Sequence, residues 1–385
     1  MPSQLAEADF LRPFRASGQE PQVLQILDPE GRVVDDALLR AGPMPSTKDL
    51  LAIYEAMVTA RVLDRQASIL QRQGRMKGTY AFAEGQEATE AASAYALRPG
   101  DALFVNYRQL AALTARGVPL IKICAKFFAN SGDPSKGRQM PAEFGFMDYN
   151  VPSAGAPVGS SITHAVGAAY AMKYLKRKDV ALVYFGDGAT STGDFHVGAN
   201  FAAVFDVPLI LLCENNQYAI SLPVSKQTKV TRLSVKAVAY GIEGFSVDGN
   251  DAIAVYKLTK YAAEKAREGG GPTMIEAITY RLSPHTTADD PLTKYRPKDE
   301  VELWKRRDPI LRLSRYLASV NALSEQEDRE LWARVEAQVK EAIKQAEALP
   351  PPPPRELITD VFGQVPWHLE EEFREIAEAL GLEVS

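Results

Sequence analysis

The clearest pattern in the chain is a strand, helix, strand unit between residues 180 and 214. An apolar run from Val180 to Phe185 is short and aromatic, which is typical of a buried parallel strand. Residues 194–205 then show apolar positions at helical spacing, and a second apolar run covers residues 209–213. The two predicted strands end next to Gly186 and Glu214. Ligands of open parallel sheets bind just beyond such strand ends.

Similar patterns predict further elements on both sides of this unit. Ser46 is expected to cap a long helix that ends near Gly74, with Asp49 three residues after the cap. Other helices are predicted at 86–97, 109–129, 233–240 and 252–267 and from about residue 161, with charge-rich amphipathic helix over 298–344; strands are predicted at 102–105, 244–247 and 273–281, and a hairpin at 22–34. This alternation predicts an α/β fold whose mostly parallel sheet is flanked by helices on both faces.

Proline and charge patterns divide the chain into three parts. Residues 1–45 contain scattered prolines and no clear period, and they are interpreted as an N-terminal arm over a surface or partner. Residues 46–345 form the predicted α/β domain. Residues 346–385 are interpreted as a stiff proline spacer, with five consecutive prolines from Pro350, followed by a C-terminal docking tail.

Oxygen ligands follow both strands of the central unit. Asp187 comes directly after the first strand, and Asn215 and Asn216 follow the second. Carboxylate and amide oxygens suit Mg²⁺, which usually combines one or two carboxylates with phosphate oxygens. Gly186 and Gly188 remove side chains where a phosphate would approach the backbone. The pattern therefore predicts a magnesium ion that holds a diphosphate between two strand ends.

Gly-Asp-Gly alone is a common turn, so its wider context matters. Here it precedes Asn-Asn by a little under thirty residues, a pattern that resembles thiamine diphosphate enzymes. The segments GDGATSTGDFH, NFAAVF and ENNQYAIS resemble the alpha subunit of the decarboxylating component of 2-oxo acid dehydrogenase complexes. The resemblance implies a thiamine diphosphate-binding fold from about residue 22 to the end of the chain.

The resemblance also implies roles for individual residues. Asp187, Asn216 and the Tyr218 carbonyl would bind Mg²⁺. His285, in the segment HTTADD, would contact the phosphate side of the cofactor and act as the catalytic residue near the reacting carbon. The remaining implied cofactor contacts are Tyr107, Arg108, Val158, Gly186, Gly188, Ala189 and Glu214. Without the resemblance, Arg108 is a surface charge at a helix N-terminus and His285 is a solvated loop residue.

The implied reaction is oxidative decarboxylation of a 2-oxo acid with acyl transfer to the lipoyl arm of an acyltransferase component. Thiazolium deprotonation needs a carboxylate against the aminopyrimidine ring. Glu84 and Glu87 are interpreted as charges in the first turn of a helix, so no acid of this chain is an obvious candidate. In the resembling family a beta subunit supplies it. The implied assembly contains two alpha and two beta chains.

Substrate identity depends on a shorter segment. Residues 136–141, KGRQMP, resemble the branched-chain members and favour 2-oxoisovalerate (3-methyl-2-oxobutanoate) as the substrate. Pyruvate and acetoin enzymes are the nearest alternatives. Three departures from the family pattern, at Ala156, Ser161 and Glu143, leave open a non-catalytic paralogue that binds diphosphate or serves as a scaffold. Ala156 and Ser160-Ser161 also stand where some members bind potassium, and Glu143 lies near the place of a family His.

Composition excludes several other classes. A net charge of −5 argues against nucleic-acid binding. Cys124 and Cys213 lie in apolar contexts typical of core residues in a reducing compartment. The chain has no run of eighteen apolar residues and no apparent secretory signal, so we expect a soluble, cytoplasmic protein without membrane partners. Thr286 matches a position that is phosphorylated in mammalian relatives, and a hydroxyl alone does not establish regulation.

Overall fold

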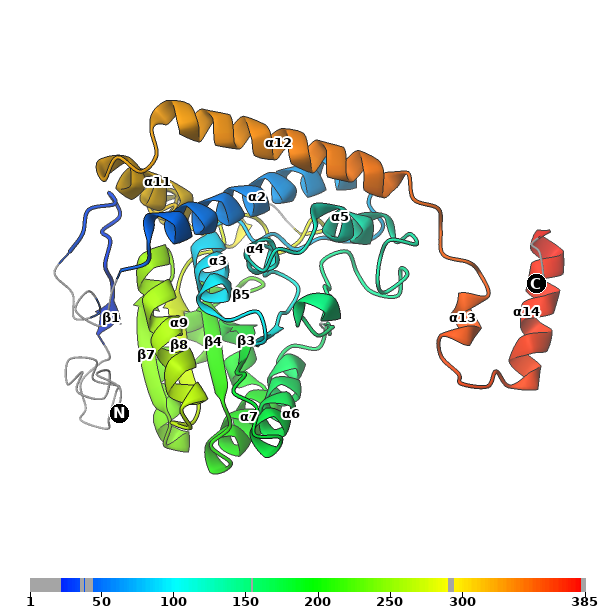
Figure 1. Cartoon of the computed structure of the whole chain (residues 1–385), viewed down its shortest axis with the longest axis horizontal. Coiled ribbons are helices and arrows are strands. Elements are labelled where there is room, and N and C mark those ends of the chain that lie inside the picture. The colour runs from blue at the N-terminus through cyan, green and yellow to red at the C-terminus, as the bar shows by residue number, and fades with distance from the viewer. Residues whose placement is uncertain (1–21, 35–37, 39–43, 154, 290–293, 382–385) are drawn as a thin grey trace.

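The computed structural model describes residues 22–34, 38, 44–153, 155–289 and 294–381. Six parallel strands form the main sheet in the order β1-β7-β8-β4-β3-β2 (Figure 1). Their bounds are β1 Val23–Leu24, β2 Ala102–Phe104, β3 Ala181–Gly186, β4 Leu209–Asn215, β7 Glu243–Asp248 and β8 Thr273–Ile278. In register, Gly186 lies opposite Glu214, so the ends of the two central strands are adjacent. Most of the predicted N-terminal arm, including residues 1–21, lies outside the described residues.

Helices cover both faces of the sheet, as predicted. Leu182 and Tyr184 of β3 pack into one hydrophobic cluster, whereas Val183 and Phe185 pack into another. Because successive side chains of a strand point to opposite faces, these are the two sides of the sheet. The first cluster contains residues of α2 (Thr47–Arg72), α3 (Glu87–Ala96), α4 (Leu110–Ala115) and α9 (Ala252–Arg267); the second contains residues of α6 (Ser160–Tyr174) and α7 (Gly193–Val204).

The helix α2 begins as the sequence predicts. Ser46 accepts a hydrogen bond from Asp49 N, and the Asp49 carboxylate accepts one from Ser46 N, which completes a capping box. The single helix predicted over 109–129 is wrong. Gly117, with φ of +78°, and Pro119 divide it into α4 and α5 (Leu120–Phe128). A left-handed glycine followed by proline ends the helical hydrogen bonding.

The predicted hairpin at 22–34 is only partly correct. Gly31 N donates to Asp28 O over 2.9 Å, and Leu27 pairs with Val33 in an antiparallel bridge. Val23 and Leu24, however, form β1 and join β7 in parallel.

The charged region 298–344 forms three helices, α10 (Lys298–Arg306), α11 (Pro309–Ser319) and α12 (Glu325–Glu347), and α12 lies along α2 (Figure 1). None of the described helices has the length and apolar character that a membrane crossing requires.

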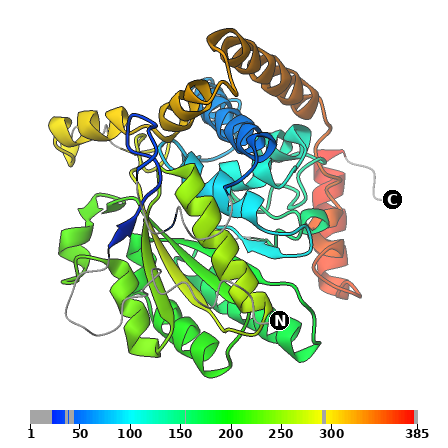
Figure 2. The same cartoon turned by 60° about the vertical axis from the view of Figure 1, so that its left-hand side comes forward.

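The C-terminal segment extends away from the sheet (Figures 1 and 2). It contains α13 (Glu356–Thr359) and α14 (Trp367–Leu380). Lys136 Nζ lies 3.0 Å from the Glu356 carboxylate and 2.6 Å from that of Asp360, and Arg138 lies 3.1 Å from Asp360. Ser131 N donates to Pro350 O over 2.9 Å. The loop at 130–138 therefore anchors the beginning of this segment.

We predict that Asp360→Lys loosens this anchor. The change removes two ion pairs and places a third cation beside Lys136 and Arg138, so amide exchange of α13 should accelerate a few-fold. Glu372→Lys is the matched control, because Glu372 is exposed on α14 and makes no contact with residues 136–138. Hydrogen exchange followed by mass spectrometry measures both variants. Equal exchange in α13 of Asp360→Lys and wild type would show that the ion pairs do not hold the segment.

Candidate functional site

A buried carboxylate lies where β3 ends. Asp187 is 2% exposed, and its Oδ2 accepts a 2.6 Å hydrogen bond from Gln227 Nε2. Burial raises the pKa of Asp187, while the hydrogen bond from Gln227 and the charges of Arg281 and Arg108 act in the opposite direction. One amide donor satisfies only part of a carboxylate that can accept about four hydrogen bonds. The Asp187 side chain is therefore suited to a cation.

The two glycines beside Asp187 are explained by different surroundings. A Cβ built on Gly186 would meet nothing within 4 Å, so this position borders open space, as expected for a ligand approach. A Cβ on Gly188 would lie 2.8 Å from Ala219 Cβ, so contact with the chain itself excludes a side chain there. The sequence analysis gave both glycines the same role and did not predict this packing constraint at Gly188.

The two asparagines after β4 point to different places. Asn215 Nδ2 donates to Glu276 over 2.8 Å, and Asn215 Oδ1 accepts from Gln217, so this side chain stabilises the sheet and the following turn. Asn216 is 6% exposed, and its Oδ1 accepts from Tyr218 N over 3.3 Å. The carbonyl oxygen of Tyr218 accepts from Arg281 Nη1 over 3.4 Å. Asn216 and the Tyr218 carbonyl therefore remain the candidates to act with Asp187.

Three of the predicted anion-binding residues lie together. Arg108 is 4% exposed, and its Nη2 lies 3.1 Å from His285 Nδ1. The Tyr107 and His285 rings pack edge to face with centroids 5.9 Å apart. A second cation, Arg281, follows β8 by three residues and has its Nη1 3.4 Å from the same His285 nitrogen. Arg108 is thus a buried residue, and its interpretation as a surface charge is wrong.

The neighbours of His285 determine its protonation. A guanidinium can only donate, so Nδ1 of His285 must accept and Nε2 carries the proton. Burial and the charges of Arg108 and Arg281 lower the pKa of His285 to about 3. Burial and Arg108 also lower the pKa of Arg281 to about 10. In this structure His285 is neutral and has one ring N–H that can donate. Only an anion bound next to the imidazole would favour its protonated form.

The remaining predicted contacts have different environments. Ala189 is 1% exposed and packs into the second core cluster. Val158 is 45% exposed and precedes Gly159, which packs against Thr192 just before α7. Glu214 is 2% exposed and accepts a 2.5 Å hydrogen bond from Gln109, and burial raises its pKa to about 7. Val158 is therefore the one of these three whose side chain solvent or a ligand can reach.

Three polar residues of this region were not predicted. Gln227 lies outside every element that the sequence predicted, yet it contacts Asp187. Arg281 was treated as the last residue of a strand, and Gln86 as the first of a helix; Gln86 instead accepts a 2.9 Å hydrogen bond from Asn216. The position of Arg281, an arginine after a buried strand, is the one signal that could have identified it.

Of the two acids predicted in the first turn of a helix, Glu87 does lie in the first turn of α3, whereas Glu84 precedes that helix. Glu87 is 0% exposed and forms an ion pair with Arg61, which also lies 2.9 Å from Asp308. The Ser283 hydroxyl donates to Glu84. Both acids are engaged within the chain itself. They position the segment between α2 and α3.

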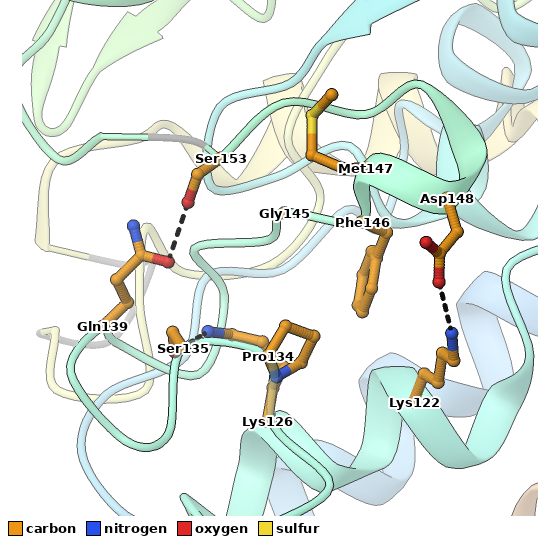
Figure 3. A pocket seen from close by; sticks show the side chains of 10 residues that line it. All are labelled: Lys122, Lys126, Pro134, Ser135, Gln139, Gly145, Phe146, Met147, Asp148 and Ser153. Carbon is orange, nitrogen blue, oxygen red and sulfur yellow. Dashed lines mark hydrogen bonds and ion pairs between the residues drawn. The ribbon is translucent and has the colours of Figure 1, made fainter. Parts of the chain in front are cut away.

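The segment KGRQMP serves mainly the surroundings of the site. Lys136 and Arg138 contact the C-terminal segment, and Gln139 lines a pocket of about 340 Å³ between α5 and the 145–153 loop (Figure 3). Gln139 accepts from Ser153 across this pocket over 3.2 Å. Glu143 is 9% exposed, and its carboxylate accepts from Met140 N. The two cations of this segment are therefore not available to bind a substrate carboxylate.

Two departures from the family pattern also have local explanations. Ser160 Oγ donates to Pro157 O over 2.8 Å, and Ser161 Oγ donates to Val105 O over 3.4 Å. Ala156 is exposed. The hydroxyls of Ser160 and Ser161 thus stabilise the beginning of α6 and the loop before it. Asp290, the last acid of the HTTADD segment, lies outside the described residues.

The donor set fits a divalent cation bound with an anionic ligand. Among the described residues no three His, Cys, Asp or Glu side chains are grouped to bind a metal. A cation beside Asp187 would therefore use amide, carbonyl and ligand oxygens, which is the set that Mg²⁺ accepts. Arg108, Arg281 and the Nε2–H of His285 provide the complementary donors for phosphate oxygens. A cation and a polyanion together would compensate both groups of buried charge.

Comparison with known proteins shows the family of the chain. The family described as "Dehydrogenase E1 component" matches residues 54–355. The chain is 38% identical over 372 residues to the pyruvate dehydrogenase E1 component subunit alpha of Staphylococcus aureus strain Mu50, and 37% identical over 372 residues to that of Staphylococcus epidermidis strain ATCC 12228. Each alignment covers 97% of both chains. The chain therefore belongs to the dehydrogenase E1 component family and is an alpha subunit of that family.

Proposed function

We propose that this chain is the alpha subunit of a 2-oxo acid dehydrogenase that binds thiamine diphosphate and Mg²⁺ at the ends of β3 and β4. The family generally uses thiamine diphosphate, which supports the organic part of this cofactor pair. One observation supports the metal most strongly. The buried carboxylate of Asp187 lies in the same site as two buried guanidinium groups, and a diphosphate bound through a divalent cation balances both.

Each residue has a role in this proposal. Asp187, Asn216 Oδ1 and the Tyr218 carbonyl bind Mg²⁺. Arg108 and His285 donate to the diphosphate, and Tyr107 packs against His285. The other proposed cofactor contacts are Arg281 and Val158, the Glu214 strand end, and the backbone at Gly186, Gly188 and Ala189.

The bound cofactor supplies the carbanion chemistry that removes carbon dioxide from a 2-oxo acid, and the protein supplies binding, orientation and electrostatics. His285 is the proposed catalytic residue because its Nε2–H has no acceptor among the described residues and could donate to an anionic ligand. The buried position of Asp187 keeps its interaction with a cation strong, since water screens it little. The acyl group would pass to the lipoyl arm of an acyltransferase component.

A beta subunit is the proposed partner, in an assembly of two alpha and two beta chains. The acids of this chain near the site are engaged: Glu87 with Arg61, Glu84 with Ser283, and Glu143 with its own turn. Glu214 is enclosed at the end of β4, so we expect a carboxylate of the beta subunit to contact the aminopyrimidine ring. The exposed apolar residues of α14, Trp367 and Ile376, support the proposal that the C-terminal segment docks on another subunit.

Two substrate classes have specific support. KGRQMP favours a branched-chain 2-oxo acid such as 2-oxoisovalerate, and we retain this as the first candidate. Pyruvate is the second candidate, favoured by the names of the Staphylococcus relatives. Lys136 and Arg138 contact the C-terminal segment, so within KGRQMP only residues 139–141 remain to influence the choice.

Thermal unfolding tests the cofactor site. Thiamine diphosphate and Mg²⁺ at a hundred times their dissociation constants should stabilise the alpha–beta assembly by about 2.7 kcal/mol. Asp187→Ala should abolish this gain because the cation loses its carboxylate. Asp148→Ala, which removes an exposed acid with a side chain 80% accessible, should keep it. A ligand-induced rise in Tm of Asp187→Ala equal to that of wild type would contradict the proposal.

Steady-state kinetics test the substrate class. With the beta subunit and a lipoyl acceptor, kcat/KM for 2-oxoisovalerate should exceed that for pyruvate by at least about tenfold, because an apolar pocket that fits the branch gains that much from the extra methyl groups. Acetoin is the third substrate to compare. A preference for pyruvate would transfer the assignment to the second candidate. An assembly that binds the cofactor and turns over none of the three substrates would support the scaffold alternative.

A further inference from the structure

Gln86 occupies an unusual place for the residue before a helix. It precedes α3, yet its side chain makes no hydrogen bond to the first turn of that helix. It is 0% exposed, and its Oε1 accepts a 2.9 Å hydrogen bond from Nδ2 of Asn216, 130 positions further along the chain. A side chain that could cap its own helix instead contacts a proposed metal ligand.

The backbone around Gln86 is fixed by the end of β8. Leu282 N donates to Glu84 O over 3.0 Å, and Thr279 Oγ1 donates to Gly85 O over 2.9 Å. Gly85 has φ of +98° and lies against the Tyr280 carbonyl, where a Cβ would have no room. On the other side, Gly85 N donates to the buried Glu87 carboxylate over 2.9 Å. The position of Gln86 is thus set by contacts that do not involve the proposed cofactor.

The orientation of both amide groups follows from one backbone group. Tyr218 N–H can only donate, so the atom of Asn216 that faces it must be Oδ1. Asn216 therefore presents Nδ2 to Gln86, and Gln86 must present Oε1 in return. Exchange of oxygen and nitrogen in the Gln86 amide would bring two N–H donors face to face. Gln86 thereby stabilises the orientation in which the second lone pair of Asn216 Oδ1 remains available.

The other end of the Gln86 amide has no partner. Its Nε2 is buried and makes no hydrogen bond within the described residues. A buried donor without an acceptor is destabilising, and most buried donors of native proteins have an acceptor. Its location next to Asn216 puts this donor beside the site in which anionic and water oxygens would gather around a cation.

We propose that Gln86 is a positioning residue of the cation site: its Oε1 holds Asn216 with Oδ1 directed to the cation, and its Nε2 donates to an oxygen bound there. This inference rests on the proposed function, because it assumes that a cation binds beside Asp187 and Asn216. It adds a residue that neither contacts the reacting atoms nor belongs to the Gly-Asp-Gly and Asn-Asn segments.

Two variants distinguish the role of the Gln86 amide oxygen from that of its nitrogen. Gln86→Met keeps the length of the side chain and removes both the acceptor and the donor. Gln86→Glu keeps an acceptor for Asn216 Nδ2 and replaces the free donor with a negative oxygen. Thr259→Val is the matched control, because Thr259 is 0% exposed on α9, its hydroxyl is also unpartnered among the described residues, and it lies outside the site.

Binding by the assembled alpha–beta protein is measured in two calorimetric titrations, Mg²⁺ at fixed thiamine diphosphate and thiamine diphosphate at saturating Mg²⁺, together with Tm without ligands. Gln86→Met should weaken Mg²⁺ binding at least about tenfold while its ligand-free Tm stays close to that of wild type, since the unsatisfied Nε2 is removed while Asn216 Nδ2 loses its acceptor. Gln86→Glu should keep Mg²⁺ binding within about threefold and weaken thiamine diphosphate binding at least about tenfold, because like charges oppose each other. Thr259→Val should match wild type in both titrations.

Several outcomes would overturn the inference. Mg²⁺ binding by Gln86→Met equal to that of wild type would show that Asn216 needs no positioning. Equal loss of Mg²⁺ affinity in Gln86→Met and Gln86→Glu would show that the Gln86 oxygen does not position Asn216. If the Gln86→Met protein fails to assemble, the Mg²⁺ and thiamine diphosphate affinities of Gln86→Glu test the inference. Absence of Mg²⁺-dependent binding in wild type would instead overturn the proposed function itself, and this inference with it.

Discussion

The arrangement of the site depends on one constraint, the burial of the Asp187 carboxylate at the end of β3. An ionised carboxylate removed from water is costly unless charge or several donors compensate it. Gln227 supplies one hydrogen bond, and the cations of Arg108 and Arg281 act from a distance. A divalent cation is the group that best satisfies the remaining oxygen lone pairs. The parallel pairing of β3 and β4 then determines which further oxygens it meets.

The opposite constraint applies to the cationic side of the site. Arg108 and Arg281 are both buried and both lie next to His285 Nδ1, so each lowers the pKa of the imidazole. Two buried guanidiniums in proximity repel each other, and a polyanion relieves that repulsion while it uses their paired donors. The cation and the polyanion are therefore complementary requirements. Within the described part of the chain, both guanidinium groups donate to neutral oxygens, and neither has a paired acid.

The sequence predicted the sheet well because the apolar runs and their register depend on local patterns. The residue pattern indicated Asp187, Asn215 and Asn216 because all three follow buried strands. Only the family resemblance favoured Asn216 over Asn215, since a turn after the strand decides which of the two faces Glu276. Gln227 and Gln86 were missed for a related reason: each contacts a residue at least 40 positions away, and no local period marks such a contact. The predicted helix at 109–129 failed where Gly117 and Pro119 should have indicated a break.

The contacts of the segment KGRQMP (residues 136–141) also could not be predicted from the sequence. KGRQMP resembles the branched-chain members of the family in sequence. In the structure, its two cations form ion pairs with Glu356 and Asp360. Resemblance identified the family through residues that lie in the site, and it was least informative where residues contact the C-terminal segment.

The central claim is that Asp187 and a diphosphate share one divalent cation. Replacement of Mg²⁺ by Mn²⁺ in the assembled protein with thiamine diphosphate allows this to be tested by electron–nuclear double resonance. Wild type should show a ³¹P coupling to the bound Mn²⁺, and Asp187→Ala should lose it. A wild-type protein that binds thiamine diphosphate without any ³¹P coupling to Mn²⁺, or an unchanged coupling in Asp187→Ala, would contradict it.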